Sequence, residues 1–506
     1  MSKTFDISLK FVIGIKDPVH GIILLTRPEY DITSSPYFDR LRYVRKSGLA
    51  HLVYPSHNST RYEHSLGTMQ ISYLIARNAL ELYLRRARKK WRDEWSDEYS
   101  VSQVIQIVRL GALLHDIGHG PFSHTSEYVL RNVIEKYYPG ELEEANRLGF
   151  TRMHEYFSFK LILEEKTIRE TIENWGINPL DVASLLSKVI PNEKKMHLKP
   201  QAWNVLRKII DSQIDADRLD NLLRDSYGMG VPYGVVDVDN LVKNIHITKI
   251  KNNELGIVVH IRALGAVEDM LDARYKMYRW LYYHQRINLL DTIVSELMQK
   301  MIDDKLIEPS RFHYTRFVEN DYSYLDDQEI LRKLIEAYNT DKDEYYLLKG
   351  LFNQEYLPLP LWRSYEEYVA IIESLPVAEN PYIVAKKIAE SFRSSEFLTE
   401  FKNIVKDKVG DMNFITITRE PTTPYDWRKG EEVYIYISPK RIVRMVDISI
   451  YIRKLLEMSE DYIHFYLYYY GKGVKRSDII KLKSRIEKIF TEFLKSHIDE
   501  VLGKRK

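Results

Sequence analysis

Apolar residues recur at helical spacing in the first half of the chain. Val104, Ile107, Val108 and Gly111 lie on one face of a predicted helix, and the same stripe continues to His115. The pattern therefore predicts a buried helix whose end carries an inward-facing imidazole. Because a buried imidazole needs a polar partner, the residues around His115 are candidates for a functional site.

Several other segments are also predicted to be helical. A helix is expected through Ile71, Ile75 and Leu82, and residues 160–212 and 310–410 follow the same period. Arginines stand near the start of the chain at positions 40, 42 and 45, and we interpret them as a solvated helix face. The chain is therefore expected to be mainly α.

Alternating residues predict a smaller number of strands. They lie at residues 11–15, 244–248, 256–261, 414–418, 432–437 and 463–468, with helices near 440–458 and 476–498. The second and third strands form a small β-hairpin that turns through residues 251–254. We expect a helical bundle with this hairpin over residues 1–310, a helical extension over 311–410, and a C-terminal α+β module over 411–506.

Composition narrows the classes of function. Lys and Arg total 74 and Asp and Glu total 72, so nucleic-acid binding is possible but is not indicated by charge. The chain has no cysteine, so any metal ligand must be His, Asp or Glu. No apolar run reaches the ~18 residues needed to cross a bilayer, and no signal peptide is recognised, so we expect a cytoplasmic protein with no membrane partner.

Three separate helical regions supply candidate metal ligands. These are His64, the adjacent pair His115 and Asp116, and Asp217. Side chains from facing helices commonly build metal sites in helical bundles. Two imidazoles and two carboxylates suit a divalent ion such as Mn²⁺, Mg²⁺, Fe²⁺ or Ni²⁺.

Further polar residues lie close to these candidates in the sequence. His119, His124 and His154 are candidate general acids or bases, because an imidazole ordinarily titrates near neutral pH. Glu127 stands one turn after His124, so we expect it to hold that imidazole. Fixed positive charge for phosphates is offered by Arg61, Arg218 and Arg274. Asp220 and Arg224, at i,i+4 spacing, are interpreted as a surface ion pair.

The motifs in their order resemble those of the HD-domain phosphohydrolases, and in particular the deoxynucleoside triphosphate triphosphohydrolases. The resemblance is carried by Arg61-Tyr-Glu-His-Ser65, by His115-Asp-Ile-Gly-His-Gly-Pro-Phe-Ser-His124, and by Asp215-Ala-Asp-Arg218. The segments Asp17-Pro-Val-His-Gly21 and Tyr278-Arg-Trp-Leu-Tyr-Tyr-His284 extend the similarity over about residues 12–290. It implies an HD-domain helical bundle.

The resemblance also implies a reaction and a role for each residue. A deoxynucleoside triphosphate would be hydrolysed to a deoxynucleoside and intact triphosphate by a homo-oligomer, a dimer or tetramer. By position, the implied roles are metal binding by His64, His115, Asp116 and Asp217; proton transfer by His124 with Glu127 and His154; phosphate binding by Arg61, His119, Arg218 and Arg274; and sugar binding by Asp225 and Tyr282.

Some positions depart from the family pattern. Asn221 stands in place of a Tyr four residues after Asp217, and Tyr278 stands in place of a His. Lys46 and Ser47 replace a Gln-Leu pair that touches the sugar, and the residues of the family's activating nucleotide site are poorly matched. We therefore expect no activation by a guanosine nucleotide.

Two other interpretations stay open at this stage. The chain could be another HD phosphohydrolase, acting on a nucleotide such as (p)ppGpp or on single-stranded nucleic acid. It could instead be a nucleotide-sensing or nucleic-acid-binding regulator with a vestigial metal site. The complete set of predicted metal ligands argues against a vestigial site. The near-zero net charge argues against a nucleic-acid-binding role that depends on phosphate contacts.

Overall fold

The computed structural model describes residues 8–87, 90–250, 254–320, 323–338, 347–419, 432–460 and 462–503. The chain is mainly helical with small sheets, which confirms the predicted fold class. Its contacts form two compact units. The first comprises Met1–Met277, Met298–Arg332 and Tyr425–Ile452, and the second comprises Tyr278–Leu297, Lys333–Pro424 and Arg453–Lys506. The boundaries predicted at residues 310 and 410 stay a prediction.

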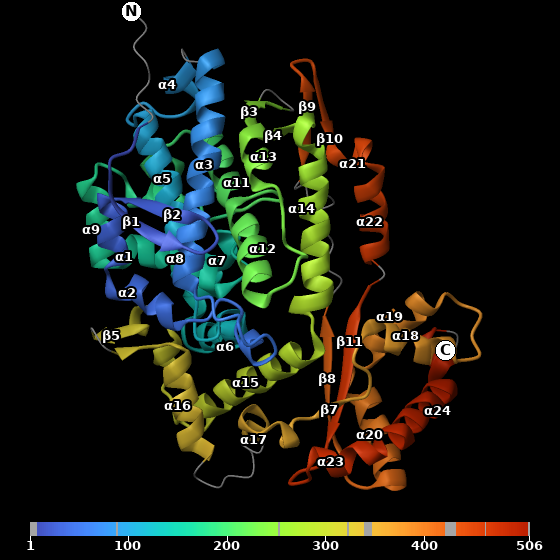
Figure 1. Ribbon diagram of the computed structural model, residues 1–506. Coiled ribbons are helices and arrows are strands. Elements are labelled where there is room, and N and C mark those ends of the chain that lie inside the picture. Colours follow the sequence, from blue (N-terminus) through green and yellow to red (C-terminus); the bar gives the residue numbers. More distant parts are fainter. Residues whose placement is uncertain are drawn as a thin grey trace, which may run out of the picture. The chain divides into compact units, whose positions relative to one another are not determined.

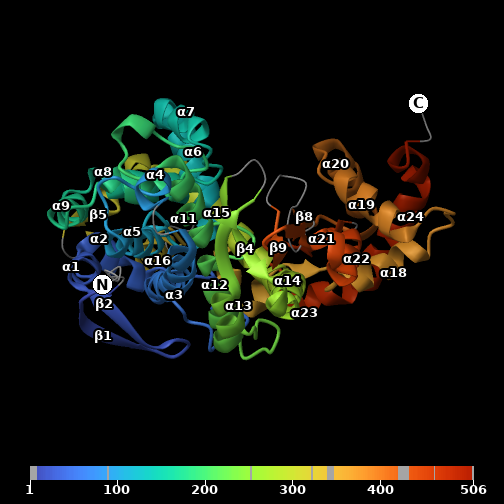
Figure 2. The ribbon, with the colours of Figure 1, turned by 90° about the horizontal axis from the view of Figure 1, so that it is seen from above.

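The first unit is a bundle of helices around α3 (Arg61–Ala87), which packs against α5 (Val101–Leu114) and α12 (Ala216–Met229) (Figures 1 and 2). Its other helices are α1 (Arg27–Thr33), α2 (Pro36–Asp39), α4 (Trp91–Glu94), α6 (Glu127–Tyr137), α7 (Pro139–Arg147), α8 (Met153–Glu164), α9 (Lys166–Asn174), α10 (Pro179–Ser184), α11 (Pro200–Ile210), α13 (Val238–Asn244), α14 (Leu264–Met277) and α21 (Met445–Ile448).

Helix α5 forms as its pattern predicts. A capping box opens it, because the Ser100 hydroxyl accepts from the Gln103 amide and the Gln103 side chain accepts from the Ser100 amide. Val104, Ile107 and Val108 are fully buried. The helix ends at Leu114 and leaves His115 at its C-cap, inside the bundle.

The first unit also contains short sheets. Strands β1 (Phe11–Asp17) and β2 (Gly21–Thr26) form one hairpin, β3 (Ile245–Lys249) and β4 (Leu255–His260) form the second, and β5 (Val318–Asn320) pairs with β6 (Ser323–Tyr324). Both predicted strands of the second hairpin are confirmed, and residues 251–253 of its predicted turn lie outside the described residues. This hairpin continues into a four-stranded sheet of order β10-β9-β4-β3, in which β9 (Tyr434–Ser438) runs parallel to β4.

The helix predicted near 440–458 is wrong in its first residues. Arg441–Arg444 forms strand β10, which pairs antiparallel with β9. The β-branched residues Ile442 and Val443 lie opposite Tyr436 and Ile435, and this pairing outweighs the helical pattern that follows. Helix α22 (Ile450–Glu460) then begins where the prediction places helix.

The second unit contains a three-stranded antiparallel sheet of order β7-β11-β8. Its strands are β7 (Leu359–Pro360), β11 (His464–Tyr470) and β8 (Asn413–Arg419); its helices are α17 (Leu348–Phe352), α18 (Tyr365–Glu373), α19 (Pro381–Ser391), α20 (Ser395–Val409), α23 (Arg476–Ile479) and α24 (Lys483–Val501). Tyr468 and Tyr469 of β11 are fully buried, so this aromatic strand is part of the core of the unit. Helices α15 (Gln285–Asp303) and α16 (Asp327–Tyr338), like α22, contain residues of both units.

The arginines near the start of the chain do not form one solvated face. Arg42 is exposed, whereas Arg40 is fully buried and donates hydrogen bonds to three backbone carbonyls. The interpretation of Arg40 as a surface residue is therefore wrong. Among the described residues, the helices are too short or too polar to cross a membrane.

Candidate metal and histidine centre

Helix ends bring the predicted metal ligands together. His64 lies in the first turn of α3, His115 caps the C-terminus of α5, and Asp217 lies in the first turn of α12. The start of α12 is fixed by Asp215, whose side chain accepts from the Arg218 amide at 2.7 Å. Helix α3 packs against both α5 and α12, so the ends of the three helices converge.

The ligand atoms of His64, His115 and Asp217 all lie within 4.8 Å of one another. Asp217 Oδ1 is 2.9 Å from His64 Nε2 and 3.5 Å from His115 Nε2. The fourth predicted ligand, Asp116, has Oδ2 3.4 Å from His64 Nε2 and 3.2 Å from His115 Nε2. We call these four residues the metal cluster.

The atoms of the metal cluster fit a divalent ion. His64 Nε2 and His115 Nε2 are buried beside the two carboxylates and make no well-aligned hydrogen bond, so these four donor atoms converge without satisfying one another. The other ring nitrogens are held, because His64 Nδ1 bonds to Asp220 at 2.7 Å and His115 Nδ1 bonds to the Ala112 carbonyl at 2.7 Å. This arrangement is typical of metal-binding histidines, whose second nitrogen donates to an oxygen.

Asp220 is a functional residue that the sequence reasoning missed. The predicted ion pair with Arg224 exists, with two contacts of 2.9 Å, but it is buried and not on the surface. Arg224 also binds Asp17, and His20 donates to the second oxygen of Asp220 at 2.6 Å. The i,i+4 spacing gave no sign that this carboxylate orients His64.

Asn221 gives further support to the metal cluster. Its side-chain amide donates to Asp217 Oδ1 at 2.7 Å. This residue departs from the family pattern at its position, and here its short amide reaches back one helical turn to a predicted ligand.

Charges in the metal cluster shift its pKa values strongly. Burial opposes the charged form of His115, but Asp116 and Asp217 outweigh it and hold its pKa well above the usual value. Burial would raise the pKa of Asp116, yet Arg61, His115 and His119 hold it well below its usual range. Burial would likewise raise the pKa of Asp217, but the nearby imidazoles of His115 and His64 hold it well below its usual range. Both carboxylates are therefore ionised, as metal ligands must be.

The remaining predicted histidines form a second group, which we call the histidine cluster: His119, His124 and His154. Their nitrogens lie within 4.8 Å of one another, and the rings of His119 and His154 stack at 3.8 Å between centroids. His119 and His154 are buried, whereas His124 is exposed. Burial and the nearby Arg61 lower the pKa of His119 well below the usual value, so this ring is neutral at neutral pH.

Glu127 supports a different histidine from the one predicted. Its carboxylate accepts from His154 Nδ1 at 2.7 Å and from the Met153 amide, and not from His124. The expected pairing is wrong because Glu127 begins α6 and faces the start of α8, which carries His154. His124 instead lies 3.4 Å from an Arg61 nitrogen, which can donate to its Nε2.

The two clusters are joined by Asp116 and Arg61. Asp116 Oδ1 is 3.3 Å from His119 Nε2, while its Oδ2 faces the metal cluster. Arg61 pairs with Asp116 at 2.5 Å and also donates to the Ser123 hydroxyl at 2.9 Å. A fixed positive charge therefore lies between the two clusters.

The other predicted substrate residues have partners of their own. Arg218 contacts Asp215 at 3.0 Å, and Arg274 contacts Gln213 at 3.4 Å. Tyr282 belongs to the second unit, in the π-helix Tyr278–Tyr282. The roles of these residues stay predictions.

Asp225 lies in a buried polar group that departs from the family pattern. Lys46, at the position of the expected Gln, pairs with Asp225 Oδ1 at 2.5 Å, and both side chains are buried. His57 Nε2 lies 3.4 Å from the same oxygen and 2.8 Å from the Ser47 hydroxyl. Asp225 is thus paired with a lysine, and its contact with a sugar stays a prediction.

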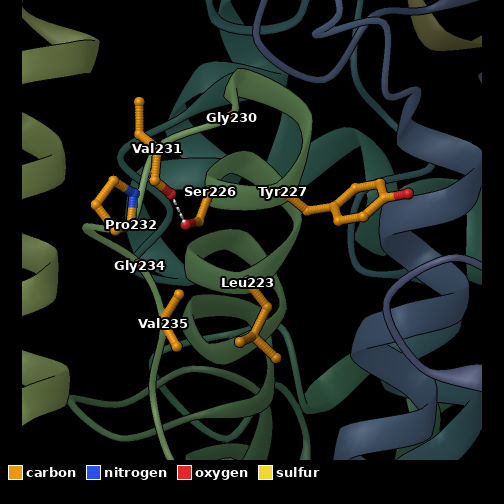
Figure 3. A pocket seen from close by; sticks show the side chains of 8 residues that line it. All are labelled: Leu223, Ser226, Tyr227, Gly230, Val231, Pro232, Gly234 and Val235. Carbon is orange, nitrogen blue, oxygen red and sulfur yellow. Dashed lines mark hydrogen bonds between the residues drawn. The ribbon is translucent and has the colours of Figure 1, made fainter.

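A pocket of about 430 Å³ lies at the C-terminal end of α12 and the loop that follows it (Figure 3). It is lined by Leu223, Ser226, Tyr227, Gly230, Val231, Pro232, Gly234 and Val235. This lining is mostly apolar and contains none of the histidines, so we do not assign the pocket to the candidate chemistry.

Comparison with known proteins identifies the domain. Residues 61–225 match the HD domain, so the chain is an HD-domain protein in this segment. The match contains both clusters from Arg61 to Asp217, together with Asp225. Asp17, which binds Arg224, and Lys46, which binds Asp225, lie outside the matched residues.

The similar proteins include uncharacterised proteins and deoxynucleoside triphosphate triphosphohydrolases. The chain is 31% identical to the uncharacterized protein MJ1154 of Methanocaldococcus jannaschii over 294 residues, covering 58% of this chain and 51% of that protein. It is 26% identical to YwfO of Bacillus subtilis, covering 73% and 78%. It is also 26% identical to the human deoxynucleoside triphosphate triphosphohydrolase SAMHD1, covering 57% and 44%. The chain thus spans about half the length of the archaeal and human relatives.

A solved structure shares the fold. A crystal structure of a hypothetical protein from Aquifex aeolicus superposes with a TM-score of 0.60 at 22% identity, covering 94% of this chain and 99% of that one. This likeness concerns the fold alone.

Proposed function

We propose that this HD-domain protein is a metal-dependent phosphohydrolase that converts deoxynucleoside triphosphates to deoxynucleosides and triphosphate. The observation that carries the proposal is the position of Asp116, which faces the metal cluster with one oxygen and His119 of the histidine cluster with the other. Phosphoester hydrolysis needs charge neutralisation and proton transfer at one place, and the two clusters offer these side by side. The printed name of the human relative supports the substrate class.

A divalent ion held by His64, His115, Asp116 and Asp217 supplies Lewis-acid neutralisation of phosphate charge when bound. The donor set of two nitrogens and two carboxylates suits Mn²⁺, Mg²⁺, Fe²⁺ or Ni²⁺. The orphaned Nε2 atoms of both histidines support this assignment.

The side chains of the protein perform the remaining tasks. Arg61, fixed between Asp116 and Ser123, offsets charge that develops on the phosphate oxygens. As water attacks the α-phosphorus and the bond to the 5′ oxygen breaks, that oxygen must receive a proton. The ring of His124 is exposed and can pass a proton between water and the leaving group, and His154 is oriented beside it by Glu127.

The products of the reaction test the proposal. We expect purified protein with Mn²⁺ or Mg²⁺ to release triphosphate and a deoxynucleoside from each dNTP. Asp217→Asn should abolish turnover, and His497→Ala, which changes a histidine of α24 outside both clusters, should leave it unchanged. Release of pyrophosphate or orthophosphate would refute the proposed reaction, and cleavage of an oligonucleotide or of (p)ppGpp without dNTP hydrolysis would assign the site to another phosphohydrolase reaction. Assembly as a dimer or tetramer stays a prediction.

A further inference from the structure

A buried carboxylate far along the chain contacts the turn that carries His124. Asp327 is the first residue of α16 and is fully buried. Its Oδ1 accepts from the Phe122 amide at 2.6 Å, and its Oδ2 accepts from the Arg45 amide at 3.0 Å. Asp327 lies about a hundred residues beyond the HD match, so no motif of the domain includes it.

The turn that Asp327 contacts has an unfavourable backbone. Phe122 and Ser123 both have positive φ, 55° and 57°, and they are two of the three non-glycine residues with this conformation in the described part of the chain. A side chain in the left-handed region persists only when its surroundings enforce it, and such strain clusters at functional sites. The next residue is His124.

Arg40 binds the preceding part of the same motif. Its guanidinium donates to the carbonyls of Ile117 at 3.0 Å and His119 at 2.6 Å, and also to the carbonyl of Leu325 at 2.9 Å. The segment 325–327 is therefore linked to the motif at two places, by Arg40 before the turn and by Asp327 within it.

A chain of hydrogen bonds extends from Asp327 to the two clusters. Arg45, whose amide binds Asp327, accepts from the Ser123 hydroxyl with its carbonyl at 2.6 Å. The same hydroxyl accepts from Arg61 Nε at 2.9 Å. The carboxylate therefore fixes both sides of the turn that presents His124 and holds Arg61.

We propose that Asp327 is a positioning residue that holds the strained Phe122–Ser123 turn, so that His124 and Arg61 face the reacting phosphate. The role in turnover rests on the proposed function, but the hold on the turn does not. Because Asp327 touches none of the four predicted metal ligands in the described structure, its loss should alter proton transfer and leave metal binding in place.

Asp327→Asn tests the proposal. An amide keeps one acceptor oxygen, but its NH₂ group faces a backbone N–H and cannot accept from it. We expect faster hydrogen exchange in residues 119–126, unchanged Mn²⁺ content, and a kcat lowered by roughly 10- to 100-fold with little change in KM.

The neighbouring residue provides a matched control. Asp326 accepts from the amides of Gln328 and Glu329, both at 2.9 Å, and so caps α16 without contacting the turn. Asp326→Asn keeps an acceptor oxygen for this cap, so the thermal midpoint, exchange in residues 119–126 and kcat should all stay near the wild-type level.

Each outcome decides the proposal. It is overturned if Asp327→Asn leaves either the exchange of the turn or kcat unchanged, or if the control variant reproduces both effects. If Asp327→Asn does not fold, the wild-type protein decides, because a Phe122 amide that exchanges as fast as an exposed amide rules out the hold. If the wild type hydrolyses no dNTP, the proposed function fails, while hydrogen exchange still decides whether Asp327 holds the turn.

Discussion

His64 donates from Nδ1 to Oδ2 of Asp220 across 2.7 Å, and neither side chain is exposed. This bond fixes the tautomer of the imidazole and leaves the lone pair of Nε2 for the metal cluster. Burial would raise the pKa of Asp220, but Arg224, His20 and His64 hold it well below its usual range. The carboxylate is therefore a permanent acceptor for His64.

Asp220→Asn should weaken metal binding. The amide cannot accept from His64 and Arg224 as the carboxylate does, so we expect the Mn²⁺ affinity to fall by roughly 10- to 100-fold. Titration calorimetry with Mn²⁺ measures this change. Asp17→Asn is the matched control, because it removes another carboxylate from Arg224 without touching His64. Equal losses in both variants would show that the ion pair with Arg224, and not the bond to His64, matters for the metal.

Chelation should destabilise the folded protein. A ligand that binds only the folded state stabilises it, by about 2.7 kcal/mol when the free metal is 100-fold above its Kd. We expect EDTA to lower the thermal midpoint of the wild type and added Mn²⁺ to restore it. The double variant His115→Ala, Asp217→Asn should show no response to either reagent. A wild-type midpoint that is insensitive to EDTA and Mn²⁺ would argue against a metal at this cluster.

The sequence predicted those features that depend on local pattern. The stripe through Val104 and Val108 predicted helix α5 and the inward direction of His115, because helical period and burial are coupled within one element. The motifs also pointed to His64 and Asp217, whose ligand atoms lie close to that of His115. Each of these residues lies at a helix end, where local signals of helix start and stop are strong.

Contacts between distant elements were not predictable in this way. Arg40 and Arg42 are two residues apart in the same short segment. Arg40 is nevertheless buried against the carbonyls of residues 117, 119 and 325, whereas Arg42 is exposed. Sequence spacing also favoured His124 as the partner of Glu127, whereas the packing of α6 against α8 selects His154. Such choices depend on tertiary packing, about which a single sequence carries no pattern.

Glu127→Gln should impair catalysis and change the response to acid. Burial would raise the pKa of Glu127, but His154 and the amides of Met153 and His154 lower it. A carboxyl group with a lowered folded pKa stabilises the protein above its unfolded pKa of about 4.3 and loses that contribution as pH falls through the folded value. The wild type should therefore be more stable than the variant at pH 7, and the difference should shrink below about pH 4.

Urea unfolding at several pH values measures this difference. Steady-state kinetics of the same variant should show a kcat lowered by roughly 10-fold or more, because the acceptor of His154 loses its negative charge. Glu63→Gln is unsuitable as a control, since that half-buried residue lies near Arg224. Glu81→Gln, in an exposed pair with Arg85, is suitable. A gap in stability that is constant from pH 7 to pH 4 would contradict the role given to the Glu127 carboxylate.

Gly118→Ala should separate α8 from the motif that carries His115 and His119. A Cβ at Gly118 would collide with the backbone of His154 and Ser158, and the Gly118 amide donates to the Ser158 hydroxyl at 2.9 Å. Because backbone cannot yield as a flexible side chain does, we expect a loss of about 1–3 kcal/mol in the free energy of unfolding, together with a lower kcat as His154 moves. Gly140→Ala is the control, since a Cβ there meets nothing within 4 Å in helix α7. It should be neutral or stabilise by up to about 1 kcal/mol, and equal stability of the two variants would show that α8 can shift away from Gly118 without cost.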